Sequence, residues 1–133
     1  MKTNKKFFGK SNNLAVDKFF LKVLYDRKIG YYSTRKPFGK KGDFITAPII
    51  SPIFSEMISI WIISFWIKIK KPKNFSFVEL GPGNGAFCKT FCKTINSFPD
   101  FKSSVKIFLL EKSQKLKRMQ KKVINEKNVV WIK

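Results

Sequence analysis

Histidine is absent from this sequence, and acidic residues and cysteines are scarce, at 8 and 2 among 133 residues. Without histidine the chain has no Ser-His-Asp triad, no histidine general base and no zinc site that needs imidazole. Two cysteines cannot form a disulfide scaffold, so we expect an intracellular, reduced protein. The length is that of a single domain, and 15 phenylalanines with 44% hydrophobic residues exclude a disordered chain.

Long apolar runs are missing as well. The longest run, Met57 to Ile67, is much shorter than the roughly 20 residues of a membrane span, and Glu56 and Pro52 precede it. The N-terminus mixes lysine with phenylalanine and leucine and lacks the uninterrupted apolar segment of a secretory signal. We therefore expect no membrane span, and a buried helix with Trp61 and Trp66 in the core.

The basic residues are abundant but scattered. Lysine and arginine together number 28, the net charge is +20, and the lysines extend from Lys2 to Lys133. Clustered basic residues would indicate a nucleic-acid or other polyanion site, because they release counterions from phosphates. The even spread favours a solvated basic surface instead. Nucleic-acid binding stays open as the less favoured interpretation.

The chain divides into three parts. Residues 1–13 are polar and basic and are expected to fray. Residues 14–72 are expected to form N-terminal helices and a loop that caps a site, with apolar residues at helical spacing in 14–25 and several glycines and prolines in 26–50. Residues 73–133 alternate strand and helix patterns.

The third part predicts an α/β fold. Three short apolar runs are expected to be buried strands, with a helix after the first and another after the second. The expected elements are strands at Phe75–Leu80, Val105–Leu110 and Val129–Ile132, a helix at Ala86–Ser97, and a helix capped by Ser113 with Leu116, Met119, Val123 and Ile124 facing inward. This order is the first half of a Rossmann-like, doubly wound parallel sheet.

A glycine-rich turn joins the first expected strand to its helix. Gly81, Gly83 and Gly85 let the backbone turn sharply and approach a ligand without an intervening Cβ. The helix behind them offers free N–H groups to a carboxylate or phosphate. Glu111 ends the next strand, where a carboxylate can accept hydrogen bonds from ribose hydroxyls. The arrangement predicts a nucleoside-containing ligand, against the simpler interpretation of a structural turn and an exposed acid.

Two such ligands compete for this turn. A dinucleotide site prefers GxGxxG and an acid roughly 20 residues further on, whereas Glu111 lies somewhat farther away. The turn here is GxGxG with Glu79 two residues before it. That version is typical of class I S-adenosylmethionine (SAM) methyltransferases, so we favour SAM over a nicotinamide dinucleotide.

Together with its neighbours, the turn closely resembles the MidA-like family of class I SAM-dependent methyltransferases. Members of this family include a mitochondrial protein-arginine methyltransferase of complex I assembly. The resemblance covers about residues 14–133 and is strongest where a GDFxTAP block and an ELGPGxG turn occur together. It rests on Gly30-Tyr31-Tyr32, on Phe38 to Pro48 (FGKKGDFITAP), on Ile50 to Phe54 with Glu56, on Val78 to Gly85 (VELGPGNG), and on Leu110 to Ser113 with Leu116 and Gln120.

The resemblance implies two groups of site residues. The residues expected to bind SAM are Glu79, Gly81, Pro82, Gly83, Gly85 and Glu111. The residues expected to line or cover the pocket are Gly42, Asp43, Phe44, Thr46 and Pro48. No metal is implied, and no residue is assigned as catalytic. Asp43 is either a pocket acid or a turn residue.

The resemblance also implies a role. The acceptor would be a protein arginine side chain, with a subunit of respiratory complex I as the candidate partner. The location would be the cytoplasm of a bacterium or the mitochondrial matrix of a eukaryote. Family members are a few hundred residues long, so the chain is expected to be an N-terminal fragment that is inactive alone. The alternative is a non-catalytic, lysine-rich module that binds a polyanion or protein partner on a degenerate methyltransferase fold.

Three departures from the family pattern stand near the expected pocket. Ile49 replaces a glutamate, Asn84 replaces an arginine and Ser55 replaces a glycine. The missing carboxylate bears on the substrate side of the pocket more than on SAM. Cys88 and Cys92 are four residues apart on one helix, and we expect them to be buried packing residues because a metal site would need more ligands.

Overall fold

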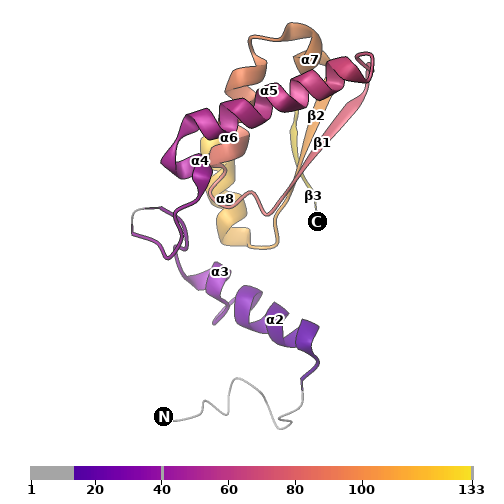
Figure 1. The fold of residues 1–133 in the computed structure, drawn as a ribbon. Helices are drawn as coiled ribbons and strands as arrows, with labels where there is room; N and C mark the ends of the chain where they lie inside the picture. Colours follow the sequence, from indigo (N-terminus) through magenta and orange to yellow (C-terminus); the bar gives the residue numbers. More distant parts are fainter. Residues whose placement is uncertain (1–13, 40, 133) are drawn as a thin grey trace.

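The computed structural model describes residues 14–39 and 41–132 (Figure 1). The prediction for residues 1–13 therefore lies outside the described residues. The elements in chain order are α2 (Val16–Tyr25), α3 (Tyr31–Thr34), α4 (Ala47–Ile50), α5 (Pro52–Lys68), β1 (Phe75–Leu80), α6 (Ala86–Ile95), α7 (Pro99–Ser104), β2 (Val105–Leu110), α8 (Gln114–Val123) and β3 (Val129–Ile132). No helix among the described residues is long and apolar enough to cross a membrane.

The three strands form one parallel sheet in the order β1-β2-β3. Phe75 pairs with Val105 at the start of β1 and β2, and Ile107 pairs with Val129 where β3 joins. The strand bounds agree with the expected ones, because short apolar runs between turns leave little choice of position. The α/β prediction of a half-sheet with parallel strands is confirmed.

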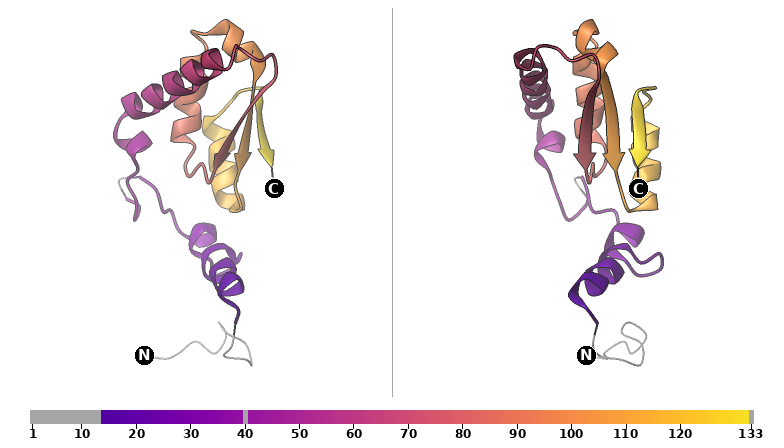
Figure 2. Two further views of the ribbon diagram at one scale, coloured as in Figure 1. Left: turned by 45° about the vertical axis from the view of Figure 1, so that its right-hand side comes forward. Right: turned by 90° about the vertical axis from the view of Figure 1, so that its right-hand side faces the viewer.

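Helices cover only one face of this sheet. Alternate side chains of β2 are buried, whereas Ser76, Val78 and Leu80 of β1 on the other face are exposed. In the right-hand view of Figure 2, which faces the sheet, α6 and α8 both lie behind the strands. Both crossovers from strand to strand therefore use one face and leave apolar side chains uncovered on the other.

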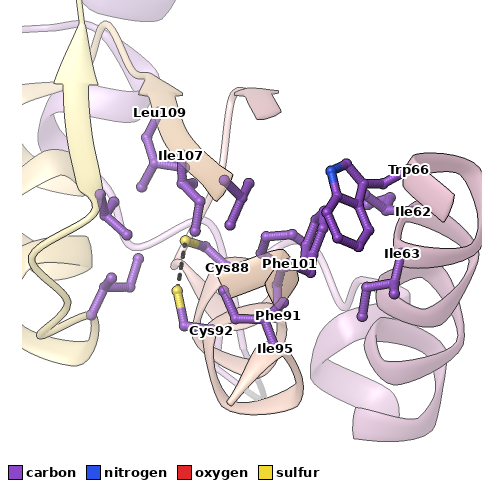
Figure 3. Close-up of a cluster of buried hydrophobic side chains, with 13 residues drawn as sticks. Ile62, Ile63, Trp66, Cys88, Phe91, Cys92, Ile95, Phe101, Ile107 and Leu109 are labelled. Carbon is purple, nitrogen blue, oxygen red and sulfur yellow. Dashed lines mark hydrogen bonds between the residues drawn. The ribbon is translucent and has the colours of Figure 1, made fainter. Parts of the chain in front are cut away.

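The hydrophobic core lies between this covered face, α5, α6 and α7 (Figure 3). Phe91 and Phe101 are fully buried at its centre, and Trp66 packs edge-on against Phe101 with ring centroids 5.3 Å apart. Cys88 and Cys92 are buried beside them with their sulfurs 3.9 Å apart, which confirms the prediction of packing residues. The hydrogen bond between them and burial raise the pKa of the Cys88 thiol, so it is not a reactive thiolate.

Helix α5 corrects one expectation. Ser51 accepts a hydrogen bond from the Ile53 N–H and Pro52 is the first helical residue, as predicted. Trp66 is buried at 4% exposure, but Trp61 is 66% exposed. The helix is apolar on all sides, whereas α6 and Phe101 of α7 pack on one of its faces, so the prediction of a buried helix holds for Trp66 and is wrong for Trp61.

The N-terminal part places α2 and α3 beyond the carboxyl ends of the strands (Figures 1 and 2). It contains two short helices, α3 and α4, inside the segment expected to be a loop. Side chains of α8 and its cap hold α3 in place: Ser113 Oγ donates to the Tyr32 carbonyl at 2.6 Å, and Lys115 Nζ donates to the Thr34 carbonyl at 2.6 Å. Helix α7, which the sequence patterns did not predict, follows α6 directly.

Helix α8 begins as predicted, since Ser113 Oγ accepts a hydrogen bond from the Leu116 N–H. Its inward face differs from the expected one. Leu116 is buried, but Val123 is 38% exposed, and the polar Gln120 is completely buried in the middle of the helix.

Candidate functional site

The glycine turn sits at the carboxyl end of β1, where parallel sheets bind their ligands. Gly81, Gly83 and Gly85 all have positive φ, at 64°, 56° and 82°. The Gly81 N–H donates to the Leu110 carbonyl at 3.0 Å, which ties the turn to the end of β2. Asn84 Oδ1 accepts from the Ala86 N–H at 3.1 Å and so satisfies one free donor at the start of α6.

The three glycines have different neighbours. A Cβ at Gly81 would meet nothing within 4 Å, so this position faces open space. A Cβ at Gly85 would lie 3.1 Å from Cδ1 of Ile124, so the third glycine serves close packing of α6 against the end of α8. A Cβ at Gly83 would lie 3.4 Å from Cζ of Phe38. The second glycine therefore faces the N-terminal segment.

A cavity of about 160 Å³ opens beside this turn. The turn and β1 form one wall, the segment before α5 forms the opposite wall, and Phe87 of α6 contributes the remaining side chain. The lining residues are Phe38, Thr46, Pro48, Glu79, Gly81, Pro82, Gly83, Asn84 and Phe87. None of these carries a positive charge, and Glu79 is the charged group among them.

Glu79 is a carboxyl group without a partner. Its Oε2 atom is buried and forms no hydrogen bond within the part of the chain that the structure describes. Burial raises the pKa of this carboxyl to about 7. A half-neutral, unpaired acid that lines a cavity is suited to an incoming donor or cation.

Glu111 follows β2 at the neighbouring strand end and is held from two sides. Its Oε1 atom accepts from the Ser113 N–H at 2.8 Å, and its Oε2 atom accepts from Gln120 Nε2 at 3.0 Å. Each carboxylate oxygen can accept two hydrogen bonds, so capacity remains for a further donor. Its 8% exposure leaves an opening toward solvent.

The loop from residue 37 to 48 brings only some of the expected pocket residues to the cavity. Thr46 and Pro48 line it. Gly42 does not, and its lack of a side chain has a local reason, because a Cβ there would lie 2.6 Å from the Pro37 carbonyl carbon. Phe44 packs around Tyr31 and Phe38 in an aromatic cluster.

Asp43 is exposed and accepts a hydrogen bond from the Tyr31 hydroxyl. This hydrogen bond raises the pKa of Tyr31 to about 12. The contact joins the loop to α3 and lies outside the cavity lining, so the geometry fits the interpretation of Asp43 as a turn residue that holds the loop.

Three residues that line the cavity were not predicted from the sequence to do so. Phe38 and Asn84 belong to the motif segments but were not singled out as cavity residues, and Phe87 carries no sequence signal beyond its place after the turn. Conversely, Gly85 and Glu111 are not among the residues that line this cavity. Among the described residues, no group of three or more acidic or cysteine side chains could hold a metal ion.

Comparison with known proteins gives this arrangement a family. Residues 57–133 match the family described as "Putative S-adenosyl-L-methionine-dependent methyltransferase". The mitochondrial protein arginine methyltransferase NDUFAF7 of Homo sapiens is 36% identical over 118 residues, which are 87% of this chain and 27% of that protein. The Drosophila melanogaster homologue is 42% identical over 85 residues, which are 64% of this chain and 20% of that protein.

A solved structure shares the fold. It is a COG1565 superfamily member from Burkholderia thailandensis, bound to S-adenosyl-homocysteine. The TM-score is 0.70 at 20% identity, over 90% of this chain and 32% of that one. This chain spans about a quarter of the length of the curated relatives it matches. The family match over residues 57–133 and the similarity to NDUFAF7 proteins confirm the resemblance, and the chain belongs to this family of S-adenosyl-L-methionine-dependent methyltransferases.

Proposed function

We propose that this chain contributes the SAM-binding part of a protein arginine methyltransferase. The observation that carries the proposal is the meeting of the glycine turn, the unpartnered Oε2 atom of Glu79, and Thr46 and Pro48 of the N-terminal part around one cavity. When bound, SAM supplies an electrophilic methyl group on its sulfonium. The protein then has to bind, orient and shield the ligand.

The residues present fit the chemical groups of SAM. The Glu79 carboxyl suits the ammonium of the amino-acid end, because its Oε2 atom is buried and the residues that line the cavity include no cation. Gly81 leaves the backbone open to close approach, Gly83 faces the ring of Phe38, and Gly85 allows α6 to start directly behind them. Glu111 retains acceptor capacity for the ribose hydroxyls.

The acceptor side of the proposal comes from the relatives. The matched NDUFAF7 proteins are named as protein arginine methyltransferases and as mitochondrial. We therefore propose a protein arginine side chain as acceptor, a subunit of respiratory complex I as candidate substrate, and the mitochondrial matrix as the location in a eukaryote or the cytoplasm in a bacterium. No side chain of the described cavity is assigned as the acceptor's base.

The proposed division of labour follows the chain. Residues 14–72 supply the cap, since Phe38, Thr46 and Pro48 form one wall of the cavity. Residues 73–133 supply the sheet, the glycine turn and Glu111.

Calorimetric titration of the purified chain with SAM and with S-adenosyl-homocysteine tests the proposal. We expect binding by the wild type and stabilisation against heat by mass action. Glu111→Ala removes a charged acceptor worth roughly 1.5–3 kcal/mol, so its affinity should fall at least tenfold. Glu111→Gln keeps one acceptor oxygen and should lose less.

Three results would count against the proposal. Absence of SAM binding by a folded wild-type chain would refute it directly. Equal affinities of wild type, Glu111→Ala and Glu111→Gln would show that the carboxylate does not contact the ribose. A preference for NADH over SAM in the same titration would favour the dinucleotide interpretation.

A further inference from the structure

Gln120 is a polar side chain buried where a helix normally presents an apolar one. It lies on the sheet-facing side of α8 and has 0% exposure. Burying an amide without hydrogen bonds costs several kcal/mol on water-to-hydrocarbon scales, so such a group is retained only where its partners are in place. Its partners therefore indicate why it is there.

Two of its three partners, Gly83 and Glu111, are residues proposed to bind the cofactor. Gln120 Nε2 donates to the Gly83 carbonyl at 2.9 Å and to Glu111 Oε2 at 3.0 Å. Gln120 Oε1 accepts from Trp131 Nε1 at 3.0 Å. The indole N–H can only donate, so it fixes which end of the amide is the oxygen and directs the NH₂ group toward the other two partners.

Each of the two donated bonds constrains a ligand-binding element. The bond to Gly83 fixes the orientation of a peptide in the middle of the glycine turn, where the missing Cβ leaves the backbone few other restraints. The bond to Glu111 occupies one lone pair of Oε2, as the Ser113 N–H does for Oε1, and so sets the direction in which the remaining lone pairs point.

We propose that Gln120 is the positioning residue that couples the glycine turn to the Glu111 carboxylate. This inference rests on the function proposed above. Gln120 is absent from the cavity lining, so it acts through Gly83 and Glu111 and does not touch the ligand. Its amide is the side chain that matches this site, because it offers two donors to two acceptors and one acceptor to a donor.

Two variants separate this role from simple packing. Gln120→Leu has a similar volume and removes all three bonds. Gln120→Glu keeps an acceptor for Trp131 but replaces the donors with a carboxylate facing Glu111 and the Gly83 carbonyl. Two carboxylates at this separation cannot both ionise without strong repulsion, so the effect of this variant must depend on pH. Gln114→Glu makes the same charge change at an exposed position of the same helix and is the matched control.

The first measurement needs no ligand. Exchange of the tryptophan indole N–H groups is followed by NMR in the full chain. We expect Gln120→Leu to accelerate exchange at Trp131, and Gln120→Glu and Gln114→Glu to leave it close to wild type. Trp66, whose Nε1 donates to the Pro72 carbonyl at 2.9 Å, is the internal reference.

The second measurement is calorimetric titration with SAM between pH 5.5 and 8.5. We expect Gln120→Leu to bind at least tenfold more weakly than wild type at all pH values. Gln120→Glu should bind SAM only slightly more weakly than wild type at pH 5.5. Between pH 5.5 and 8.5, the ratio of wild-type to Gln120→Glu affinity should rise tenfold or more. Gln114→Glu should give a ratio near one throughout.

The outcomes distinguish the two proposals. If exchange of the Trp131 indole N–H is unchanged in Gln120→Leu, the hydrogen-bond network and the positioning role are both refuted, whether or not SAM binds. If wild type binds SAM and the ratio of wild-type to Gln120→Glu affinity stays near one at every pH, the positioning role is refuted and the proposed function stands. A folded wild type that shows the expected Trp131 behaviour but does not bind SAM refutes the proposed function and removes the ligand to be positioned.

Discussion

The ring of Phe38 lies over Gly83, so that a Cβ built on Gly83 would be 3.4 Å from Cζ of Phe38. The contact joins a loop near the start of the chain to the turn after β1. It is part of a wider aromatic cluster, in which Phe38 stacks on Tyr32 and Tyr32 stacks on Tyr25. The N-terminal segment is therefore a structural wall of the proposed SAM site.

This contact makes Gly83→Val a sharp test of the turn. The substitution forces a branched side chain onto a residue with φ of 56° and fills the gap beneath Phe38. We expect SAM affinity to fall at least tenfold, about 1.4 kcal/mol, in calorimetric titration. Gly39→Val also places a branched residue at positive φ, where a Cβ meets nothing within 4 Å, and it controls for backbone strain. Equal SAM affinities of Gly83→Val and wild type would show that the glycine turn is not part of the SAM site.

Glu79 predicts a pH dependence of stability. Its pKa is raised by burial from 4.5 to about 7, so the folded state holds a proton that the unfolded state has released between these values. Stability should therefore fall as pH rises from about 4.5 to 7. Glu79→Gln should abolish this loss, which is on the order of 3 kcal/mol for a shift from 4.5 to about 7. Urea unfolding of wild type and Glu79→Gln at pH 4.5 and 8 measures this loss. An equal change in the free energy of unfolding of the two proteins would contradict the prediction.

The same carboxyl predicts the opposite pH dependence for ligand binding. An ionised Glu79 pairs better with the ammonium of SAM, so wild-type affinity should increase as pH rises through about 7. Glu79→Gln should bind more weakly at pH 8 and lose this increase. Titrations with SAM across this range check the prediction, and an unchanged slope in Glu79→Gln would place the ammonium elsewhere.

Ser113 is expected to matter more than an ordinary helix cap. Its hydroxyl accepts from the Leu116 N–H and also donates to the Tyr32 carbonyl, and it is 1% exposed. Ser113→Ala should cost roughly 1–3 kcal/mol, because the cap is lost and a carbonyl loses its donor. Ser51→Ala removes a cap on α5 without a comparable long-range bond and should cost about 1 kcal/mol or less. Similar losses in denaturant unfolding would show that the Tyr32 contact contributes nothing.

The exposed apolar side of α5 predicts self-association of the purified chain. Met57 and Trp61 on α5 and Val78 on β1 are 64%, 66% and 47% exposed. Met57→Lys should reduce association in sedimentation experiments and change the free energy of unfolding by less than about 0.5 kcal/mol. Ile63→Lys, at a position only 2% exposed, should abolish folding. A monomeric wild type at high concentration would contradict the prediction.

Several features of this protein were readable along the chain. The strands β1, β2 and β3 coincide with mostly apolar runs bounded by polar residues or turns, and such short runs leave little choice of strand position. The glycine turn and the Ser51-Pro52 helix start depend on residues next to each other, so local chemistry suffices. The family resemblance rests on the same local segments.

Other features depend on which neighbour each face meets. Trp61 and Trp66 are equally apolar, yet only Trp66 has Phe101 to pack on. Gln120 looks like a surface residue until Gly83, Glu111 and Trp131 surround it. Helical periodicity predicts which side chains share a face, but a polar group can be buried only where distant segments supply its hydrogen-bond partners, and the folded chain alone brings those segments together.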